Sequence, residues 1–427
     1  MINKRREFVK QAGLLTAYSF LVPVLKATAA TVGKKDIKIL LRSAWQTVNI
    51  GDTGHTFGIM ELFKEYLPAA KVVLWARNLE LGADELMAKT YPNLEIINGT
   101  QVGSNGVPED PRLKAAFEEC DIMVHSSGYN VTARRELWEW WNATKKPFGV
   151  YGVSLDEADD KLKELINKAS FFYCRDSESL RYLQSLNLSR PIQGLAFDAT
   201  FAIQLENEAL AKSYLQSVGL KDGEFICVIP RLRYTPYWQM KNKKPTAEEE
   251  VKESISNLYK ETDAAKLREV IIEWVRTTGF KVLACAEVTY QVGLSKEVLV
   301  DPLPEDVKKN VVWRSTFWNP DEAGSIYAKS RAIVTYELHS AIISFSKNIP
   351  AIHLKQSTDT RKGQMWRDIG LGDWYFQIDE TPGSQIATEL MKIHNNYPAA
   401  LQKIQQSKKV VKRVQHDTMN AIKKTLK

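Results

Sequence analysis

The chain has 427 residues, of which 44% are hydrophobic and 26% are charged, with 22 glycines and 16 prolines. This composition is that of a globular protein, so it excludes a disordered chain, a collagen and a coiled coil, and the length predicts two or three domains. The net charge of +7 is concentrated at the ends, because residues 1–30 carry +4 and residues 401–427 carry +7. The body between them carries −4, which argues against a nucleic-acid partner.

The N-terminus has the pattern of a twin-arginine (Tat) export signal. Residues 4–10 read KRREFVK, and the apolar segment from Ala12 to Leu25 is too short for a lasting membrane span and is interrupted by Pro23. An Ala-x-Ala sequence at residues 27–29 suits signal peptidase. We expect residues 1–30 to be a signal peptide that uses the Tat machinery, and the mature protein to be periplasmic without a stable membrane span. An uncleaved anchoring helix is the alternative.

Apolar runs of strand length alternate with amphipathic stretches of helix length from Ile37 onward, and the pattern restarts after residue 222. Strands buried on both faces and separated by helices are typical of a parallel, doubly wound sheet. The predicted strands are 37–44, 71–76, 94–97, 122–126, 148–153, 170–174, 224–230, 280–286, 310–313, 331–335 and 349–354. The predicted helices are 56–66, 83–90, 112–119, 132–143, 157–169, 177–186, 261–277, 320–329 and 339–346.

These elements predict an α/β protein with two Rossmann-like domains that face a cleft, at residues 31–205 and 206–383. The segment 384–427 continues as a helical pattern with a basic end, and we expect it to brace the domains. A solvated helix face accounts for its lysines better than contact with nucleic acid or membrane does. Ligands of such folds bind at the carboxyl ends of the strands, which here face the cleft.

A polar, glycine-containing segment, residues 45–55, follows the first predicted strand and includes Asn49, Gly51, Asp52 and His55. A turn of this kind before a helix presents N–H groups to an anionic ligand. The segment matches neither the dinucleotide fingerprint nor a Walker loop, so it indicates neither a dinucleotide nor ATP. Asp52 is a candidate functional residue, with a helix N-cap as the alternative role.

A second group of polar residues leaves strand 331–335, where Glu337 and His339 stand two residues apart. Both side chains can point into one cleft, and a carboxylate with an imidazole suits proton transfer near neutral pH. The alternative is a helix N-terminus that Glu337 and Ser340 cap.

The order of these motifs resembles the polysaccharide pyruvyl transferase family over about residues 37–375. The resemblance rests on Asn-x-Gly-Asp at 49–52, Leu-His-Ser-Ala-Ile at 338–342, Asn-Ile-Pro-Ala-Ile at 348–352 and the downstream Lys362. It implies a fold like that of GT-B glycosyltransferases. It also implies transfer of pyruvate from phosphoenolpyruvate, as co-substrate, to two hydroxyls of a polysaccharide as a cyclic ketal.

The resemblance also assigns roles to residues. His339 matches the acid/base of the family, Asp52 its early acidic residue, and either Arg231 or Arg233 its anion-holding arginine. Asp198 stands where the family tends to have aspartate, although a structural role explains it equally well. Substrate contact is expected at Asn49, Gly51, His55, Arg231, Arg233 and Lys362.

Glu337 departs from the family, which has arginine at this position to hold phosphoenolpyruvate. Two like charges about 4 Å apart repel by about 4 kcal/mol at a surface-like dielectric, and Lys362 or Arg361 would offset this in part. Because phosphoenolpyruvate is cytoplasmic and the chain carries an export pattern, a second hypothesis is an exported hydrolase that removes pyruvate ketals. Glu337 would then be the acid, His339 or Asp52 would position water, and Arg231 or Arg233 would hold the carboxylate. A third hypothesis is a non-catalytic glycan-binding protein.

The four cysteines are far apart in the sequence without a histidine at ligand spacing, which argues against a zinc or iron–sulfur site. No metal or cofactor is expected, because the chemistry that the resemblance implies requires none. The aromatic residues give weaker signals. Trp138, Trp140 and Trp141 are assigned to core packing, and His125 either lines the cleft or is a buried histidine. The candidates for stacking on a sugar are Trp45, Tyr234, Tyr237 and Trp238.

Overall fold

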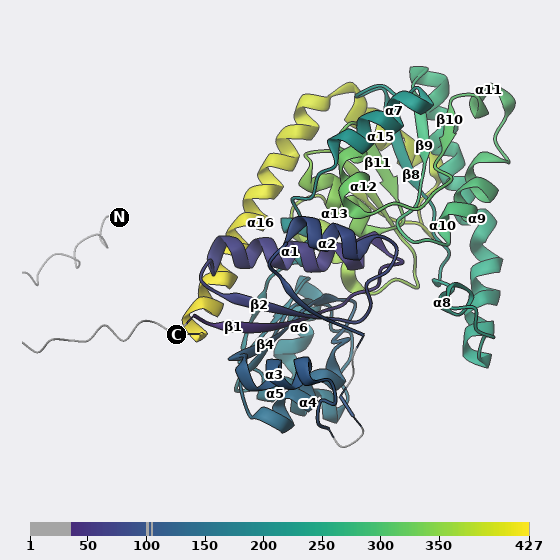
Figure 1. Ribbon diagram of the computed structural model, residues 1–427. Helices are drawn as coiled ribbons and strands as arrows, with labels where there is room; N and C mark the ends of the chain where they lie inside the picture. The colour runs from purple at the N-terminus through teal and green to yellow at the C-terminus, as the bar shows by residue number, and fades with distance from the viewer. Residues whose placement is uncertain (1–35, 100–101, 104–105, 427) are drawn as a thin grey trace, which may run out of the picture. The chain divides into compact units, whose positions relative to one another are not determined.

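The computed structural model describes residues 36–99, 102–103 and 106–426. The predicted signal peptide, residues 1–30, lies outside the described residues. The described chain contains two parallel sheets with helices around them (Figure 1), which confirms the predicted α/β class with two Rossmann-like units. The predicted domain limits themselves stay predictions.

The first sheet has seven strands in the order β3-β2-β1-β4-β5-β6-β7. All neighbouring strands are parallel, so every connection is a crossover that carries a helix or a loop across a face. The strands are β1 (Lys38–Ser43), β2 (Lys71–Ala76), β3 (Glu95–Asn98), β4 (Ile122–Gly128), β5 (Phe148–Val153), β6 (Phe171–Cys174) and β7 (Ile192–Leu195). The helices along this part of the chain are α1 (Ile50–Tyr66), α2 (Ala83–Thr90), α3 (Pro111–Glu119), α4 (Arg134–Thr144), α5 (Asp160–Lys168), α6 (Ser177–Ser185) and the 3₁₀ turn η1 (Ala199–Ala202).

The second sheet has six parallel strands in the order β10-β9-β8-β11-β12-β13. They are β8 (Phe225–Ile229), β9 (Lys281–Ala284), β10 (Val311–Trp313), β11 (Ala332–Thr335), β12 (Ala351–Lys355) and β13 (Tyr375–Gln377). The longer helices of this part are α7 (Glu208–Val218), α9 (Ala247–Thr278), α12 (Pro320–Tyr327), α13 (Leu338–Ser346), α15 (Gly383–Asn395) and α16 (Tyr397–Thr425). The short ones are α8 (Tyr237–Met240), α10 (Gln291–Ser295), η2 (Lys296–Val300), α11 (Glu305–Lys308), η3 (Arg361–Gly363), α14 (Gln364–Asp368) and η4 (Gly372–Trp374).

Alternate residues of the strands in the first sheet enter different cores. In β1, Ile39 and Leu41 join the larger hydrophobic cluster, whereas Leu40 joins a second cluster on the opposite face. The second cluster also includes Trp140, which is fully buried, so the assignment of this tryptophan to the core is confirmed. Because helices cover both faces of the sheet, a ligand can reach it at the carboxyl ends of the strands.

Several elements differ from the sequence prediction. Helix α1 begins at Ile50 and not at residue 56, because the side chain of Asn49 caps it. Strands β7 and β13 and helix α7 were not predicted, and α9 is 32 residues long where 261–277 was expected. The charged first half of α9 has few buried residues, so no apolar pattern marks it. Its start is instead set by a capping box of Thr246 and Glu249.

The C-terminal segment forms two helices and not one, since α15 ends at Asn395 and α16 starts at Tyr397 with Pro398 in its first turn. Helix α16, yellow in Figure 1, extends from the second sheet's helices back to the first sheet. There the hydroxyl of Thr418 donates to the carbonyl of Leu195 at 3.1 Å. In the described part of the chain, no helix is long and apolar enough to cross a membrane.

The tight contact between α1 and η1 generates a stability prediction. A Cβ at Gly58 would lie 2.0 Å from the carbonyl oxygen of Ala199, so Gly58→Ala must push these elements apart. We expect it to lower the free energy of unfolding by about 1–3 kcal/mol. Gly293→Ala is the control, because its Cβ meets nothing within 4 Å and should be neutral or slightly stabilising. Urea unfolding of both variants checks this, and equal midpoints would contradict it.

Candidate functional site

A cavity of about 610 Å³ opens where the carboxyl ends of both sheets meet. The residues that line it stand at or just after the carboxyl ends of strands, which include β1, β4 and β6 of the first sheet and β8, β9, β11 and β12 of the second sheet. This is where ligands of doubly wound folds bind. The candidate residues from the sequence line this cavity, apart from Gly51: they are Asn49, Asp52, His55, Arg231, Arg233, Glu337, His339 and Lys362.

The segment predicted to bind an anion is the first turn of α1. The side chain of Asn49 accepts hydrogen bonds from the N–H groups of Gly51, at 2.7 Å, and Asp52, at 3.3 Å. These two amides are therefore satisfied within the turn and do not point to a ligand, contrary to the prediction. Gly51 has another role, because a Cβ there would lie 2.1 Å from Nδ1 of His339. Its missing side chain gives the imidazole room against the helix.

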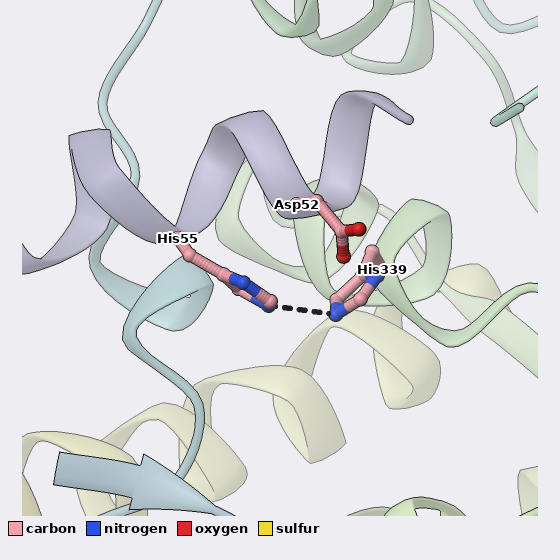
Figure 2. Close-up of side chains that lie close together, drawn as sticks. All are labelled: Asp52, His55 and His339. Carbon is pink, nitrogen blue, oxygen red and sulfur yellow. Dashed lines mark hydrogen bonds between the residues drawn. The ribbon is translucent and has the colours of Figure 1, made fainter. Parts of the chain in front are cut away.

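His55 and His339 meet at the centre of the site (Figure 2). Their Nε2 atoms are 3.0 Å apart, and the rings are nearly perpendicular at 78°. Oδ2 of the fully buried Asp198 lies 3.3 Å from Nε2 of His55 and 3.8 Å from Nε2 of His339. Arg175 donates to the same oxygen at 3.0 Å. Asp198, whose role the sequence analysis left undecided, thus lies beside both histidines, although it does not itself line the cavity.

Glu287 is a site residue that the sequence analysis missed. It is fully buried, and its Oε1 lies 3.2 Å from Nδ1 of His339. Its Oε2 accepts from the N–H of Ser340 at 2.6 Å and from the hydroxyl of Ser340 at 2.8 Å. A carboxylate directly after the apolar run 280–286 was a usable signal, because that strand was predicted to end at the cleft.

Burial and neighbouring charges set the protonation of His339 and of the carboxyl groups around it. Burial lowers the pKa of His339, but the carboxylates of Asp198 and Glu287 outweigh burial and raise the pKa to about 10. Burial also opposes ionisation of Asp198 and Glu287. His55 and His339 nevertheless hold the pKa of Asp198 below its ordinary value, and His339 does the same for Glu287. For Asp52, burial dominates and raises the pKa. His339 is therefore a cation at neutral pH, with two carboxylates around it.

Glu337 is 4% exposed and does not cap α13 with its side chain. Its Oε1 accepts from Nε2 of Gln291 at 2.6 Å and lies 3.3 Å from Nε of Arg231. Burial raises the pKa of Glu337, although Arg231 opposes this. The cation beside Glu337 is thus Arg231, where the sequence analysis expected Lys362 or Arg361 to offset the charge, and burial shifts the carboxyl towards its neutral form. Repulsion of a phosphate by Glu337 stays a prediction.

The two candidate arginines differ in how their donors are used. Arg233 donates to Asp263 through Nε and Nη2, and it also contacts Asp379. Arg231 pairs with Asp359 and with Glu337, and Lys362 lies 3.8 Å from the same Asp359. Arg231 is thus the arginine that faces Glu337. Which of the two arginines holds an anion stays a prediction.

The aromatic candidates all line the cavity, although Trp45 and Trp238 are only 3% and 5% exposed. Tyr234 and Tyr237 are half-buried and offer more surface. His125 is fully buried, and its Nδ1 forms a hydrogen bond with the carbonyl of Arg42 at 2.7 Å. Of the two alternatives, the buried histidine is therefore confirmed. Burial lowers the pKa of His125 to about 4, which leaves it neutral.

Asp52, His55 and His339 place one donor atom each within 4.8 Å of one another, a spacing that a small cation could occupy. Figure 2 shows Asp52 and His55 on the same helix, both directed towards His339. The sequence-based expectation of neither metal nor cofactor stays a prediction.

A polysaccharide pyruvyl transferase model matches residues 49–358 of this chain. This is most of the sequence and includes both the α1 segment and the His339 segment. The chain belongs to the polysaccharide pyruvyl transferase family. A search of curated proteins finds no match.

Solved structures show the same architecture at low sequence identity. A glycosyltransferase from Rickettsia africae is 10% identical with a TM-score of 0.57, over 92% of this chain and 100% of that one. An Escherichia coli ADP-heptose heptosyltransferase II is 12% identical with a TM-score of 0.50, over 85% and 99%. A UDP-GlcNAc 2-epimerase from Neisseria meningitidis is 9% identical with a TM-score of 0.52, over 88% and 99%. These similarities confirm the predicted GT-B-like fold.

The raised pKa of His339 generates a pH prediction. Its folded-state pKa of about 10 exceeds the ordinary 6.5, so its stabilising effect is full below pH 6.5 and is lost as the pH rises towards 10. The free energy of unfolding of wild type should therefore fall towards that of His339→Gln across this interval. Urea unfolding at several pH values measures the difference. Exposed His416→Gln is the control and should parallel wild type. A constant gap between wild type and His339→Gln would contradict the assignment.

Proposed function

We propose that this protein forms pyruvate ketals on a polysaccharide, by transferring pyruvate from phosphoenolpyruvate to two sugar hydroxyls. The observation that carries the proposal is a cationic histidine, His339, in the same cavity as Arg231 and Lys362. An acid and an anion-binding group together are what the reaction requires. Family membership supports the transfer of a pyruvyl group, and the half-buried tyrosines at the cavity support a sugar ligand.

The chemistry assigns one task to each group. His339 donates a proton to the methylene carbon of phosphoenolpyruvate while a sugar hydroxyl forms a bond to the neighbouring carbon. The second hydroxyl then bonds to that carbon as the bond to phosphate breaks. One hydroxyl proton returns to the histidine, and the other leaves with phosphate. Arg231 and Lys362 hold the carboxylate, and this is easier when Glu337 is neutral.

A second candidate, hydrolysis of the ketal, is favoured by Glu287. The N-terminus of α13 is where an anion such as phosphate would be stabilised. Glu287 already occupies it, because its carboxylate accepts from the N–H and the hydroxyl of Ser340. Glu337 adds a carboxyl with a raised pKa beside it, which suits a general acid for a leaving sugar oxygen.

An assay in two arms distinguishes the reactions. The transferase requires phosphoenolpyruvate and releases phosphate when polysaccharide is added, whereas the hydrolase releases pyruvate from a pyruvylated polysaccharide without phosphoenolpyruvate. In either arm, His339→Gln should lower turnover about 100-fold or more, and exposed His416→Gln should leave it unchanged.

Glu337→Gln separates the two roles of Glu337. It should abolish pyruvate release if Glu337 is the hydrolytic acid. It should leave transfer intact or tighten the binding of phosphoenolpyruvate if Glu337 is a spectator. Glycan binding without turnover in both arms would overturn both proposals and leave a glycan-binding protein.

We also propose export to the periplasm through the Tat system, based on the N-terminal pattern. Fractionation of the host cell should place wild type in the periplasm, and Arg5→Lys together with Arg6→Lys should retain the chain in the cytoplasm at unchanged charge. Wild type in the cytoplasm would contradict export. It would also remove the objection that phosphoenolpyruvate is out of reach.

A further inference from the structure

One polar contact in the cavity joins two imidazoles from distant parts of the chain. His55 lies on α1 and His339 on α13, and their Nε2 atoms are 3.0 Å apart. Both rings are buried, and both line the cavity. A distance of 3.0 Å is that of a hydrogen bond, so one nitrogen donates and the other accepts.

The other nitrogen of each ring determines where the protons are. Nδ1 of His55 lies 3.2 Å from the carbonyl of Ala44, which can only accept, so this Nδ1 carries hydrogen. Nδ1 of His339 lies 3.2 Å from the carboxylate of Glu287, which the Ser340 N–H and hydroxyl hold in its accepting form. This Nδ1 therefore carries hydrogen too.

In two neutral rings of this tautomer, both Nε2 atoms would present lone pairs to each other at 3.0 Å, and these would repel. A single additional proton between them turns repulsion into a charged hydrogen bond. We propose that His55 and His339 share one proton between their Nε2 atoms and act as one acid–base unit, with Asp198 as its counter-charge. His55 is then a positioning residue that holds the proton on His339.

The charged groups closest to the pair fit a single positive charge. Asp198 follows β7 and lies 3.3 Å from His55, and Glu287 follows β9 and bonds to His339. Burial raises the pKa of Asp52, one turn before His55 on α1, and His55, His339 and Lys362 oppose that shift. Arg175 pairs with Asp198 at 3.0 Å.

The same surroundings disfavour a divalent metal. A metal about 2.1 Å from both nitrogens in tetrahedral geometry would separate them by about 3.4 Å, more than the observed 3.0 Å. The guanidinium of Arg175 contacts the very carboxylate that faces the pair, so a dication would be repelled. The geometry therefore favours the proton.

This inference rests on the proposed function for its catalytic meaning. In transfer, the proton on the pair passes to the methylene carbon of the substrate. The pair then takes up a proton from an attacking sugar hydroxyl, and so returns to its starting state. The balance needs no group beyond the two imidazoles and the substrates.

Nuclear magnetic resonance of the full chain with ¹⁵N-labelled histidine tests the pair without any turnover. Wild type should show a far-downfield proton that couples to an Nε2 nitrogen. His55→Phe and His339→Phe should each abolish it, and exposed His416→Gln should retain it. In His55→Phe, the midpoint of the His339 titration should fall by at least one pH unit, a tenfold loss of proton affinity. His55→Gln, which keeps an accepting oxygen, should restore most of it.

The absence of the shared proton in wild type would overturn the proposal even if the His55 variants failed to fold. An unmoved His339 midpoint in a folded His55→Phe would also overturn it, as would stoichiometric binding of added Zn²⁺ by wild type at neutral pH. Because these measurements require no substrate, a failed activity assay leaves the pair intact and counts against the proposed function alone. If turnover is found, the alkaline limb of its pH profile should move with the His339 midpoint.

Discussion

The buried carboxylate of Asp198 is the interaction on which the site depends. A carboxylate that is fully removed from water is costly unless several donors surround it. Here the guanidinium of Arg175, at the end of β6, donates to one oxygen, and Thr200 donates its N–H to the other. The imidazoles of His55 and His339 lie 3.3 and 3.8 Å from the first oxygen. Because α1 follows a strand of the first sheet and α13 a strand of the second, this one charge also holds helices of the two halves together.

Small residues make this convergence possible. Gly51 leaves room for the His339 ring, and Gly58 lets α1 approach the carbonyl of Ala199, directly after Asp198. Helix α1 therefore sits closer to η1 than a helix with side chains at these positions could. Its cap, Asn49, starts the helix early enough to point both Asp52 and His55 at the cavity.

The site is a cavity of paired charges. On the side of the second sheet, Arg231 is paired with both Asp359 and Glu337, and His339 is held between Glu287 and Asp198. In a cavity of low dielectric, such pairs are strong and any uncompensated charge is costly. A ligand that enters must therefore exchange one pairing for another, which is how a bound carboxylate could redirect Arg231 and leave Glu337 neutral.

The sequence by itself determined the fold class and the neighbourhood of the site. Strand-length apolar runs specify parallel strands, and polar residues just after them fall at the carboxyl ends. Asp52, Glu337 and His339 were therefore predicted to lie at one cleft, and all three line the cavity. The tertiary structure alone decided that His55 touches His339, which is 284 residues away, and that Glu287 holds the opposite side of that ring. It also decided that Glu337 is paired with Arg231 and not with Arg233. The physical reason is that periodicity and capping are local, whereas the partner of a buried charge is set by how helices from two sheets pack.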